Sequence, residues 1–378
     1  MMKAAVFLSS VSLTLAFAPT RFSQSRSSLS SAAAAARPLA ATAASTFPDF
    51  VPAEVADVQD PLALRMLQKL ERVSVNTEEC PSGVPSSWYN SEPKNAKGPV
   101  VVLLHGFDSS CLEFRRLAPA LEDLGVPVVA PDVLGWGFTD ARESRTTSAL
   151  AKRKHLHALW QQELGGRPLV LVGASLGGAI ALDFAVAYPD AVERMVLIDA
   201  QGFIDGAGPM GGFPNPLARL GIKLLGSKPL RNLANQLSYF DKEKFATDDA
   251  MLVGRLPVVM PGWEDSNLDY MTTGGFEPSA LVPKVGCPTL VLWGDTDKIL
   301  DPALYAQRFV DEMPDARLMM VEECGHVPHL EHPATAAAAI AEFVEGPKAA
   351  AKGASKQNAA GGLANPFEGL MAAFAPKQ

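Results

Sequence analysis

The sequence predicts an α/β fold, in which a mostly parallel, twisted sheet carries helices on both faces and one inserted helical cap. Two observations lead to this prediction. From Pro99 onward, short apolar runs closed by turn residues alternate with amphipathic stretches, which is typical of buried parallel strands joined by right-handed helical crossovers. The alternation breaks between Asp199 and Thr289, where about ninety residues are too many for a plain connection in a compact domain.

Each expected strand is a short apolar run that ends at turn residues. In chain order the runs are PVVVLLHG (99–106), VPVVAPD (126–132), PLVLVG (168–173), RMVLID (194–199), TLVLWGD (289–295) and RLMMVEE (317–323). The stretches between them predict helices over Cys111–Leu124, Thr146–Leu164, Leu176–Tyr188, Pro302–Glu312 and Pro333–Val344. Ahead of the first run, RVSVN (72–76) and SSWYN (86–90) could form an antiparallel hairpin.

The chain is expected to divide into a core, a cap and two terminal segments. Residues 46–200 and 285–346 form the α/β core, and residues 201–284 form the helical cap. Residues 347–378 begin as a low-complexity linker and are expected to be a disordered tail. The apolar side chains expected to shape a pocket under the cap are Phe203, Met210, Phe213, Leu224, Leu225 and Trp263.

Residues 1–45 differ in composition from the rest of the chain, because they contain Lys3, Arg21, Arg26 and Arg37 but no acidic residue. Their start has the charged and apolar regions of a signal peptide, and the Ser-, Ala- and Arg-rich stretch that follows is typical of a transit peptide. This combination resembles the bipartite presequence of algae with secondary plastids, so we expect a plastid (chloroplast) location. Secretion or a mitochondrial presequence is the alternative.

The composition also argues against several classes of partner. A formal net charge of −8 disfavours a nucleic-acid partner, which requires a basic face. The body of the chain has no apolar run of about eighteen residues, so no integral membrane span is expected, although peripheral contact through the cap is compatible with the sequence. The four cysteines, Cys80, Cys111, Cys287 and Cys324, lie far apart and predict neither a zinc site nor a disulfide scaffold.

The segment Gly173-Ala174-Ser175-Leu176-Gly177 matches the nucleophile-elbow pattern G-x-S-x-G. A strand is expected before it and a helix after it, so Ser175 would lie at a sharp turn. Side chains at positions 173 and 177 would clash in such a turn, which accounts for the glycines, and Gly178 would let the helix pack closely. The alternative is a glycine-rich turn in which the serine has no chemical role.

A serine nucleophile requires a base, which is usually a positioned histidine. Three of the six histidines lie in CGHVPHLEHP (324–333). His326 follows the last expected strand and is the expected base, whereas His329 and His332 are expected to cap or pack the next helix. The histidines of the charged stretch AKRKHLHALW (151–160) are expected on a solvated face. No carboxylate spacing around the three clustered histidines indicates a metal site, and no cofactor is expected.

The base requires a carboxylate that fixes its tautomer. Asp297 follows the strand TLVLWG and precedes His326 by 29 residues, so it is the expected partner. Asp295 is the close alternative, and Asp199 after the earlier strand is another. The chain order Ser175, Asp297, His326 is the order expected for this architecture.

An acyl-transfer site also requires two N–H donors for the oxyanion. The backbone N–H of Leu176, directly after the serine, is one expected donor. The other is the backbone N–H of Phe107 in HGFDSS (105–110), which Gly106 would allow to approach the serine. We expect His105 to brace this loop.

The motifs VVLLHGF, APDVLGWGFTD, GASLGG, LWGDTD and CGHVPHLEHP stand in the order found in the α/β-hydrolase family. The resemblance covers roughly Val100–Val344, and HGFDSSCLEFRRLAPAL together with DVLGWGFTD also resembles plastid-type α/β hydrolases of plants and algae. It implies an α/β-hydrolase fold in which Asp132, Gly135, Gly137 and Asp140 form a structural turn. A serine at the elbow separates the chain from the haloalkane dehalogenases and soluble epoxide hydrolases, and the lack of HGGG separates it from that esterase branch.

The expected activity is that of an esterase-like or lipase-like serine hydrolase, which cleaves a hydrophobic or lipid-like carboxylic ester through an acyl-enzyme. The partner is therefore a small-molecule ester. The compartment alone makes glycerolipid esters and the phytyl esters of chlorophyll pigments candidates. Alternatives on the same fold are a non-catalytic small-molecule receptor, a cofactor-free haloperoxidase, an acyltransferase and a C–C bond hydrolase.

Overall fold

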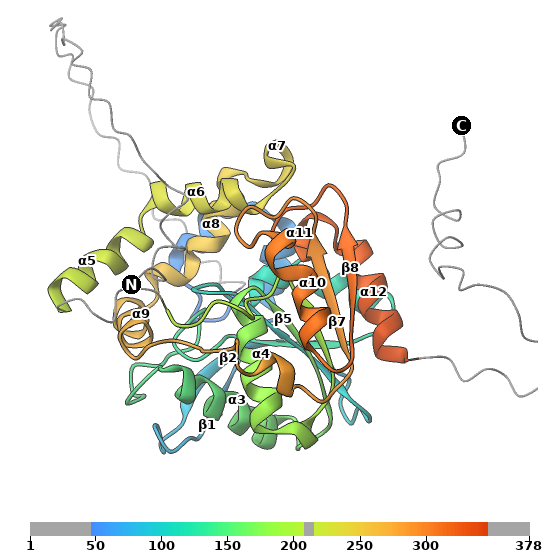
Figure 1. Cartoon of the computed structure of the whole chain (residues 1–378). Coiled ribbons are helices and arrows are strands. Elements are labelled where there is room, and N and C mark those ends of the chain that lie inside the picture. Colours follow the sequence, from blue (N-terminus) through green and yellow to red (C-terminus); the bar gives the residue numbers. More distant parts are fainter. Residues whose placement is uncertain (1–46, 208–214, 347–378) are drawn as a thin grey trace, which may run out of the picture. The chain divides into compact units, whose positions relative to one another are not determined.

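The computed structural model describes residues 47–207 and 215–346. An eight-stranded sheet in the order β1-β2-β4-β3-β5-β6-β7-β8 runs through this part of the chain (Figure 1). The strands are β1 (Glu71–Val75), β2 (Val84–Asn90), β3 (Val100–Leu104), β4 (Val128–Pro131), β5 (Leu169–Ala174), β6 (Val192–Ile198), β7 (Thr289–Gly294) and β8 (Ala316–Val321). Only the β1–β2 and β2–β4 pairs are antiparallel. The mostly parallel sheet and the hairpin ahead of it are confirmed.

Helices cover both faces of the sheet because alternate side chains of each strand point to opposite faces. From β3, Val100, Val102 and Leu104 pack into one core and Val101 and Leu103 into another. The first core includes side chains of α3 (Ala149–Glu163), α4 (Leu176–Ala187) and α10 (Pro302–Glu312). The second includes α1 (Pro61–Gln68), α2 (Leu117–Asp123) and α12 (Pro333–Glu345).

The expected helix Cys111–Leu124 forms as two pieces, a 3-10 turn at Cys111–Phe114 and helix α2. Pro119 explains the break, because proline lacks an N–H group and its ring clashes with the carbonyl four residues earlier in a helix interior. As the third residue of α2, Pro119 lies in a first turn, where proline is tolerated.

The expectation of a solvated face for residues 151–160 is wrong at Lys152 and His155, which are buried. The Lys152 amine donates a hydrogen bond to the carbonyl oxygen of Leu134 and lies 3.6 Å from the ring centroid of Trp136. The His155 ring shares a 2.7 Å hydrogen bond with the hydroxyl of Ser86. These partners offset the cost of burying polar groups, and nothing in the local sequence pattern reveals them.

Between β6 and β7, the described residues form five α-helices, which together with their connections we call the helical insertion. They are α5 (Asn215–Leu225), α6 (Lys228–Ser238), α7 (Lys242–Phe245), α8 (Asp248–Arg255) and α9 (Trp263–Thr272). Trp263 is buried, but Leu224 is 56% exposed because α5 turns Ala218 and Ile222 inward instead. The prediction that Leu224 shapes an internal pocket is therefore wrong.

Several expectations fall on residues outside the described part of the chain. They are the presequence, the C-terminal tail and the pocket residues Met210 and Phe213. Among the described helices, none combines the length and the apolar character that crossing a bilayer requires.

Candidate active site

Ser175 lies at the turn between β5 and α4, with φ of 52° and ψ of −120°. A positive φ is costly for a residue that has a side chain, and such strain is often found at functional sites. The backbone N–H of Ser175 donates to Ile198 at 2.9 Å, and its carbonyl oxygen accepts from the N–H of Gln201 at 2.8 Å. These bonds fasten the strained turn to the end of β6.

The glycines on either side of Ser175 are required by space. A Cβ atom at Gly173 would overlap the backbone of Gly177, and one at Gly177 would overlap the carbonyl oxygen of Leu104. The clash predicted at positions 173 and 177 is confirmed. A Cβ atom at Gly178 would meet the Cβ of Ala200, so this glycine lets α4 pack closely.

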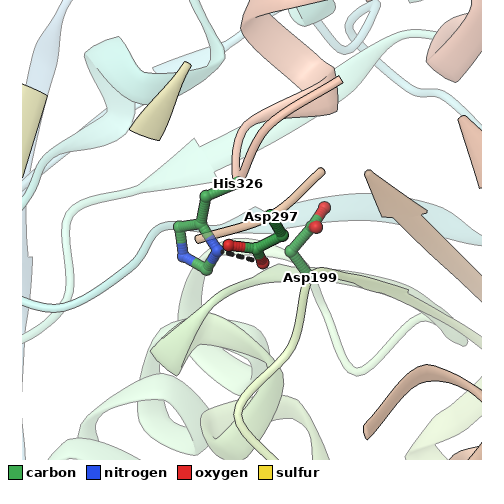
Figure 2. Close-up of side chains that lie close together, drawn as sticks. All are labelled: Asp199, Asp297 and His326. Carbon is green, nitrogen blue, oxygen red and sulfur yellow. Dashed lines mark hydrogen bonds and ion pairs between the residues drawn. The ribbon is translucent and has the colours of Figure 1, made fainter. Parts of the chain in front are cut away.

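His326 and Asp297 form a hydrogen-bonded pair at the carboxyl edge of the sheet (Figure 2). Nδ1 of His326 lies 2.7 Å from Oδ2 of Asp297. The other carboxylate oxygen, Oδ1, accepts from the N–H groups of Ile299 at 2.7 Å and Leu300 at 3.0 Å. Asp297 is thus held by its own turn, and a proton on Nδ1 leaves Nε2 of His326 with a lone pair.

Asp199 is a second, buried acid beside this pair. Figure 2 shows the Asp297 carboxylate between the His326 ring and the Asp199 carboxyl group, and ligand atoms of the three residues lie within 4.8 Å of one another. Burial, and next the negative charge of Asp297, raise the pKa of Asp199 well above its ordinary value. A cation could be held at such spacing, but both oxygens of Asp297 and Oδ1 of Asp199 already accept hydrogen bonds.

Asp295, the close alternative to Asp297, has a different contact. Its Oδ1 accepts a hydrogen bond from the N–H of Cys324 at 3.2 Å, in the loop that precedes His326. The structure therefore brings Asp297, and not Asp295, to the imidazole ring.

The strand order places Ser175 at the same edge of the sheet as these side chains. Ser175 follows β5, Asp199 follows β6 and Asp297 follows β7, and these three strands are neighbours in the sheet. Neither the hydroxyl of Ser175 nor Nε2 of His326 hydrogen-bonds to another described residue. Catalytic hydrogen bonds are often long in ligand-free structures and tighten when a substrate binds.

The loop after β3 lies against the serine. A Cβ atom at Gly106 would be 3.3 Å from the Cβ of Ser175. His105 braces the loop as expected: its Nδ1 hydrogen-bonds the carbonyl oxygen of Gly106 at 2.9 Å, and its Nε2 accepts from the N–H of Val133 at 3.0 Å. Within the described chain, the N–H groups of Phe107 and Leu176 have no hydrogen-bond acceptor.

Asp108 is a residue that sequence reasoning missed. Its buried carboxylate forms an ion pair with Arg231 of α6 and accepts hydrogen bonds from Nε1 of Trp263 at 2.6 Å and Nδ2 of Asn267 at 3.2 Å, both on α9. These contacts join the loop that carries Phe107 to the helical insertion. The only sequence signal is an acidic residue directly after Phe107.

Two glutamates with little solvent exposure hold the loops on either side of the site. Glu113 accepts the N–H of Gly106 at 3.0 Å, and His329 lies 3.3 Å from its other oxygen. Burial pushes the pKa of Glu113 upward, but the adjacent His329 outweighs this effect and the pKa falls to about 2. Glu331 accepts the N–H of Gly325 at 2.7 Å and that of Phe240 at 3.0 Å, which joins the His326 loop to the helical insertion.

Comparisons with known proteins identify the family of the chain. A model described as the alpha/beta hydrolase family matches residues 101–340. Among curated proteins, the chain is 38% identical to the alpha/beta hydrolase domain-containing protein VTE7 of Arabidopsis thaliana, over 79% of this chain and 91% of that protein. It is 29% identical to Lipase 1 of Psychrobacter immobilis, over 64% and 75% of the two chains. Among solved structures, a thermophilic esterase from Thermogutta terrifontis has a similar fold, with a TM-score of 0.61 and 23% identity over 73% of this chain and 98% of that one.

Proposed function

Because the chain belongs to the alpha/beta hydrolase family, we propose that it is a serine hydrolase that cleaves a hydrophobic carboxylic ester. The observation that carries the proposal is the 2.7 Å hydrogen bond between His326 and Asp297 at the sheet edge where Ser175 occupies a strained elbow. This arrangement suits a histidine that accepts a proton from a serine hydroxyl.

In the proposed reaction, Oγ of Ser175 attacks the ester carbonyl carbon while Nε2 of His326 takes the hydroxyl proton. Asp297 holds Nδ1–H and stabilises the imidazolium. The N–H groups of Phe107 and Leu176 bind the oxyanion. His326 then gives its proton to the leaving alcohol, and an acyl-enzyme remains on Ser175. A water molecule, deprotonated by His326, releases the carboxylic acid and restores the serine.

The helical insertion is proposed to act as the cap over this site. Support comes from its contacts with both catalytic loops, through Asp108 after β3 and through the His326 backbone, whose N–H donates to Ser238 at 2.7 Å. A hydrophobic substrate is supported by the aromatic group beside the Phe107 loop, in which the Phe107 and Trp136 rings are 5.4 Å apart, and by the relationship to a protein named as a lipase.

A fluorophosphonate probe tests the proposal, because it labels only an activated serine. We expect labelling in the wild type, loss of labelling in Ser175→Ala and in His326→Ala, and retention in His332→Asn, which alters another histidine of the same motif, whose ring contacts the carbonyl oxygen of Glu323 at 3.1 Å. Equal loss in both histidine variants, with both still folded, would contradict His326 as the base. Absence of labelling in a folded wild type that binds esters tightly would instead support the receptor alternative. A competition screen across acyl-chain lengths and chlorophyllide esters then defines the substrate.

We also propose a plastid location, specifically that of an alga with a secondary plastid. The support is the acid-free, Arg- and Ser-rich composition of residues 1–45 after an apolar start. A fluorescent fusion to residues 1–45 should enter plastids, whereas secretion or mitochondrial import of the same fusion would contradict the proposal.

A further inference from the structure

Helix α5 exposes leucines that the fold does not use. Leu217, Leu220 and Leu224 are 50%, 54% and 56% exposed. Their spacing of three and four residues places them on one face of the helix, while Ala218 and Ile222 are fully buried on another. The buried face explains how α5 packs, and the exposed face requires a separate explanation.

Further large apolar side chains are exposed on α6 and directly after it. On α6, Leu230 and Leu233 are 38% and 39% exposed, and Phe240, after the end of α6, is 46% exposed. Figure 1 shows α5 and α6 following one another along the outside of the helical insertion. We call these exposed side chains the apolar stripe: Leu217, Leu220, Leu224, Leu230, Leu233 and Phe240.

The sequence segment that carries the apolar stripe is basic, although the whole chain is acidic. Residues 206–240 contain no Asp or Glu but include Arg219, Lys223, Lys228 and Arg231, in a chain of formal net charge −8. Arg219 pairs with Glu264 at 3.0 Å, and Arg231 pairs with Asp108. Lys223 and Lys228 are exposed, and neither forms an ion pair with a described residue. Two exposed cations of this segment are therefore available for an external partner.

We propose that the apolar stripe, with Lys223 and Lys228, docks the protein on the surface of an anionic lipid membrane. A helix that places leucines on one face and lysines beside them is suited to lie at a bilayer interface, where the leucines enter the acyl boundary and the amines reach anionic headgroups. A second copy of the chain is a poorer occupant, because a symmetric contact would bring the unpaired lysines of both copies together.

The docking surface is connected to the catalytic loops. Arg231 of α6 contacts Asp108, beside Phe107, and the carbonyl oxygen of Ser238 at the end of α6 contacts the backbone of His326. Docking through α5 and α6 would hold the site close to esters dissolved in the membrane. That benefit rests on the proposed function, but the binding itself requires no catalysis.

Vesicle flotation tests the inference, using vesicles of phosphatidylcholine with phosphatidylglycerol and vesicles of phosphatidylcholine alone. The full chain and the chain from Phe47 onward, which keeps every described element, are compared in a Ser175→Ala background, so that turnover does not alter the lipid. We expect both to float with the anionic vesicles, and less with the neutral ones.

Matched variants test whether vesicle binding depends on the apolar stripe and its two lysines or on exposed leucines and lysines anywhere on the surface. Leu220→Ser with Leu224→Ser should lower vesicle partitioning roughly tenfold, whereas Leu124→Ser with Leu304→Ser, at exposed leucines outside the insertion, should not. Lys223→Gln with Lys228→Gln should remove the preference for anionic vesicles, whereas Lys94→Gln with Lys97→Gln should preserve it. Unchanged thermal unfolding in each variant shows that the fold is intact.

Three outcomes would overturn the inference. The first is equal flotation of the wild type and the folded stripe variant. The second is a dimer in solution that the stripe variant abolishes, which would identify a second copy as the occupant. The third is flotation that appears only after residues 347–378 are removed, which would identify the chain's own C-terminal segment. If the fluorophosphonate probe does not label the folded wild type and the protein still floats with anionic vesicles, only the proposed function is refuted.

Discussion

Oδ1 of Asp108 accepts a hydrogen bond from Nε1 of Trp263 at 2.6 Å, so a buried contact joins the loop after β3 to helix α9 of the helical insertion. The other oxygen of the same carboxylate faces Arg231 on α6. A single acidic side chain therefore fixes two helices of the insertion relative to the N–H group of Phe107. The shape of the oxyanion loop and the position of the insertion should consequently depend on each other.

Asp108→Ala should destabilise the protein by about 2–4 kcal/mol, because it leaves the Trp263 indole N–H and the Arg231 guanidinium without their buried partner. Urea unfolding measures this loss. Asp140→Asn is the matched control, since Asp140 pairs with the exposed Arg142 and should have little effect. If Asp108→Ala unfolds like the wild type, the contact does not hold the loop to the insertion.

Asp297→Asn should lower kcat by about 10⁴-fold with the fold preserved. The amide oxygen would keep the N–H groups of Ile299 and Leu300, so the amide NH2 would donate to Nδ1 of His326 and favour the wrong imidazole tautomer. Steady-state ester hydrolysis measures the effect. Asp295→Asn should change kcat far less, since an amide oxygen can still accept the N–H of Cys324. Comparable losses in the two variants would remove the distinction between these aspartates.

The free energy of unfolding of Asp199→Asn, measured relative to that of the wild type, should increase as pH rises. The pKa of Asp199 is raised above its ordinary value of 3.8, so between these two pKa values the folded chain holds a proton that the unfolded chain has lost. The free energy of unfolding of the wild type then falls with increasing pH in that window. An asparagine side chain stays neutral at every pH, so the variant does not lose stability in this window.

The test for Asp199 is urea unfolding of both proteins at about pH 5 and about pH 8. The stability difference between variant and wild type should be larger at the higher pH. Asp190→Asn, at an exposed surface position, supplies the control. A difference that is constant across pH would show that Asp199 is ionised in the folded protein.

For Lys152→Met, the free energy of unfolding relative to the wild type should increase as pH falls. Burial lowers the pKa of Lys152 well below its ordinary value of 10.5, so between these two pKa values the unfolded chain binds a proton that the folded chain does not. The wild type therefore loses stability as pH falls through this window, and the variant does not. Unfolding experiments should give a relative gain for Lys152→Met that grows toward low pH, while the exposed Lys94→Met serves as the control. A gain that shrinks on acidification would mean that Lys152 is charged when buried.

Much of the catalytic edge could be predicted because its signals are local. The elbow requires glycines two residues on either side of Ser175, and its strand and helix are adjacent in sequence, so the pattern is readable without coordinates. The positions of Asp297 and His326 follow in the same way, since each comes directly after an apolar run, and parallel strands bring their carboxyl ends to one edge.

Other features depend on residues that are distant in the chain. Asp108 meets Trp263 across 155 positions, and Asp199 lies beside Asp297 only because β6 and β7 pair across the whole insertion. The local sequence pattern predicts Lys152 and His155 at the surface, because their buried partners, Leu134 and Ser86, belong to other segments.

By itself, the sequence determined the layered α/β architecture, the elbow at Ser175 and the order in which the candidate catalytic groups appear. The spacing of apolar residues, the residues that form turns and the order of motifs along the chain can all be seen without coordinates. Only the tertiary structure decided which acid reaches His326, which side chains fasten the loops and which leucines of α5 face outward. Those outcomes depend on how the insertion packs against the sheet. Packing is a balance of contacts among remote segments, and no local pattern records it.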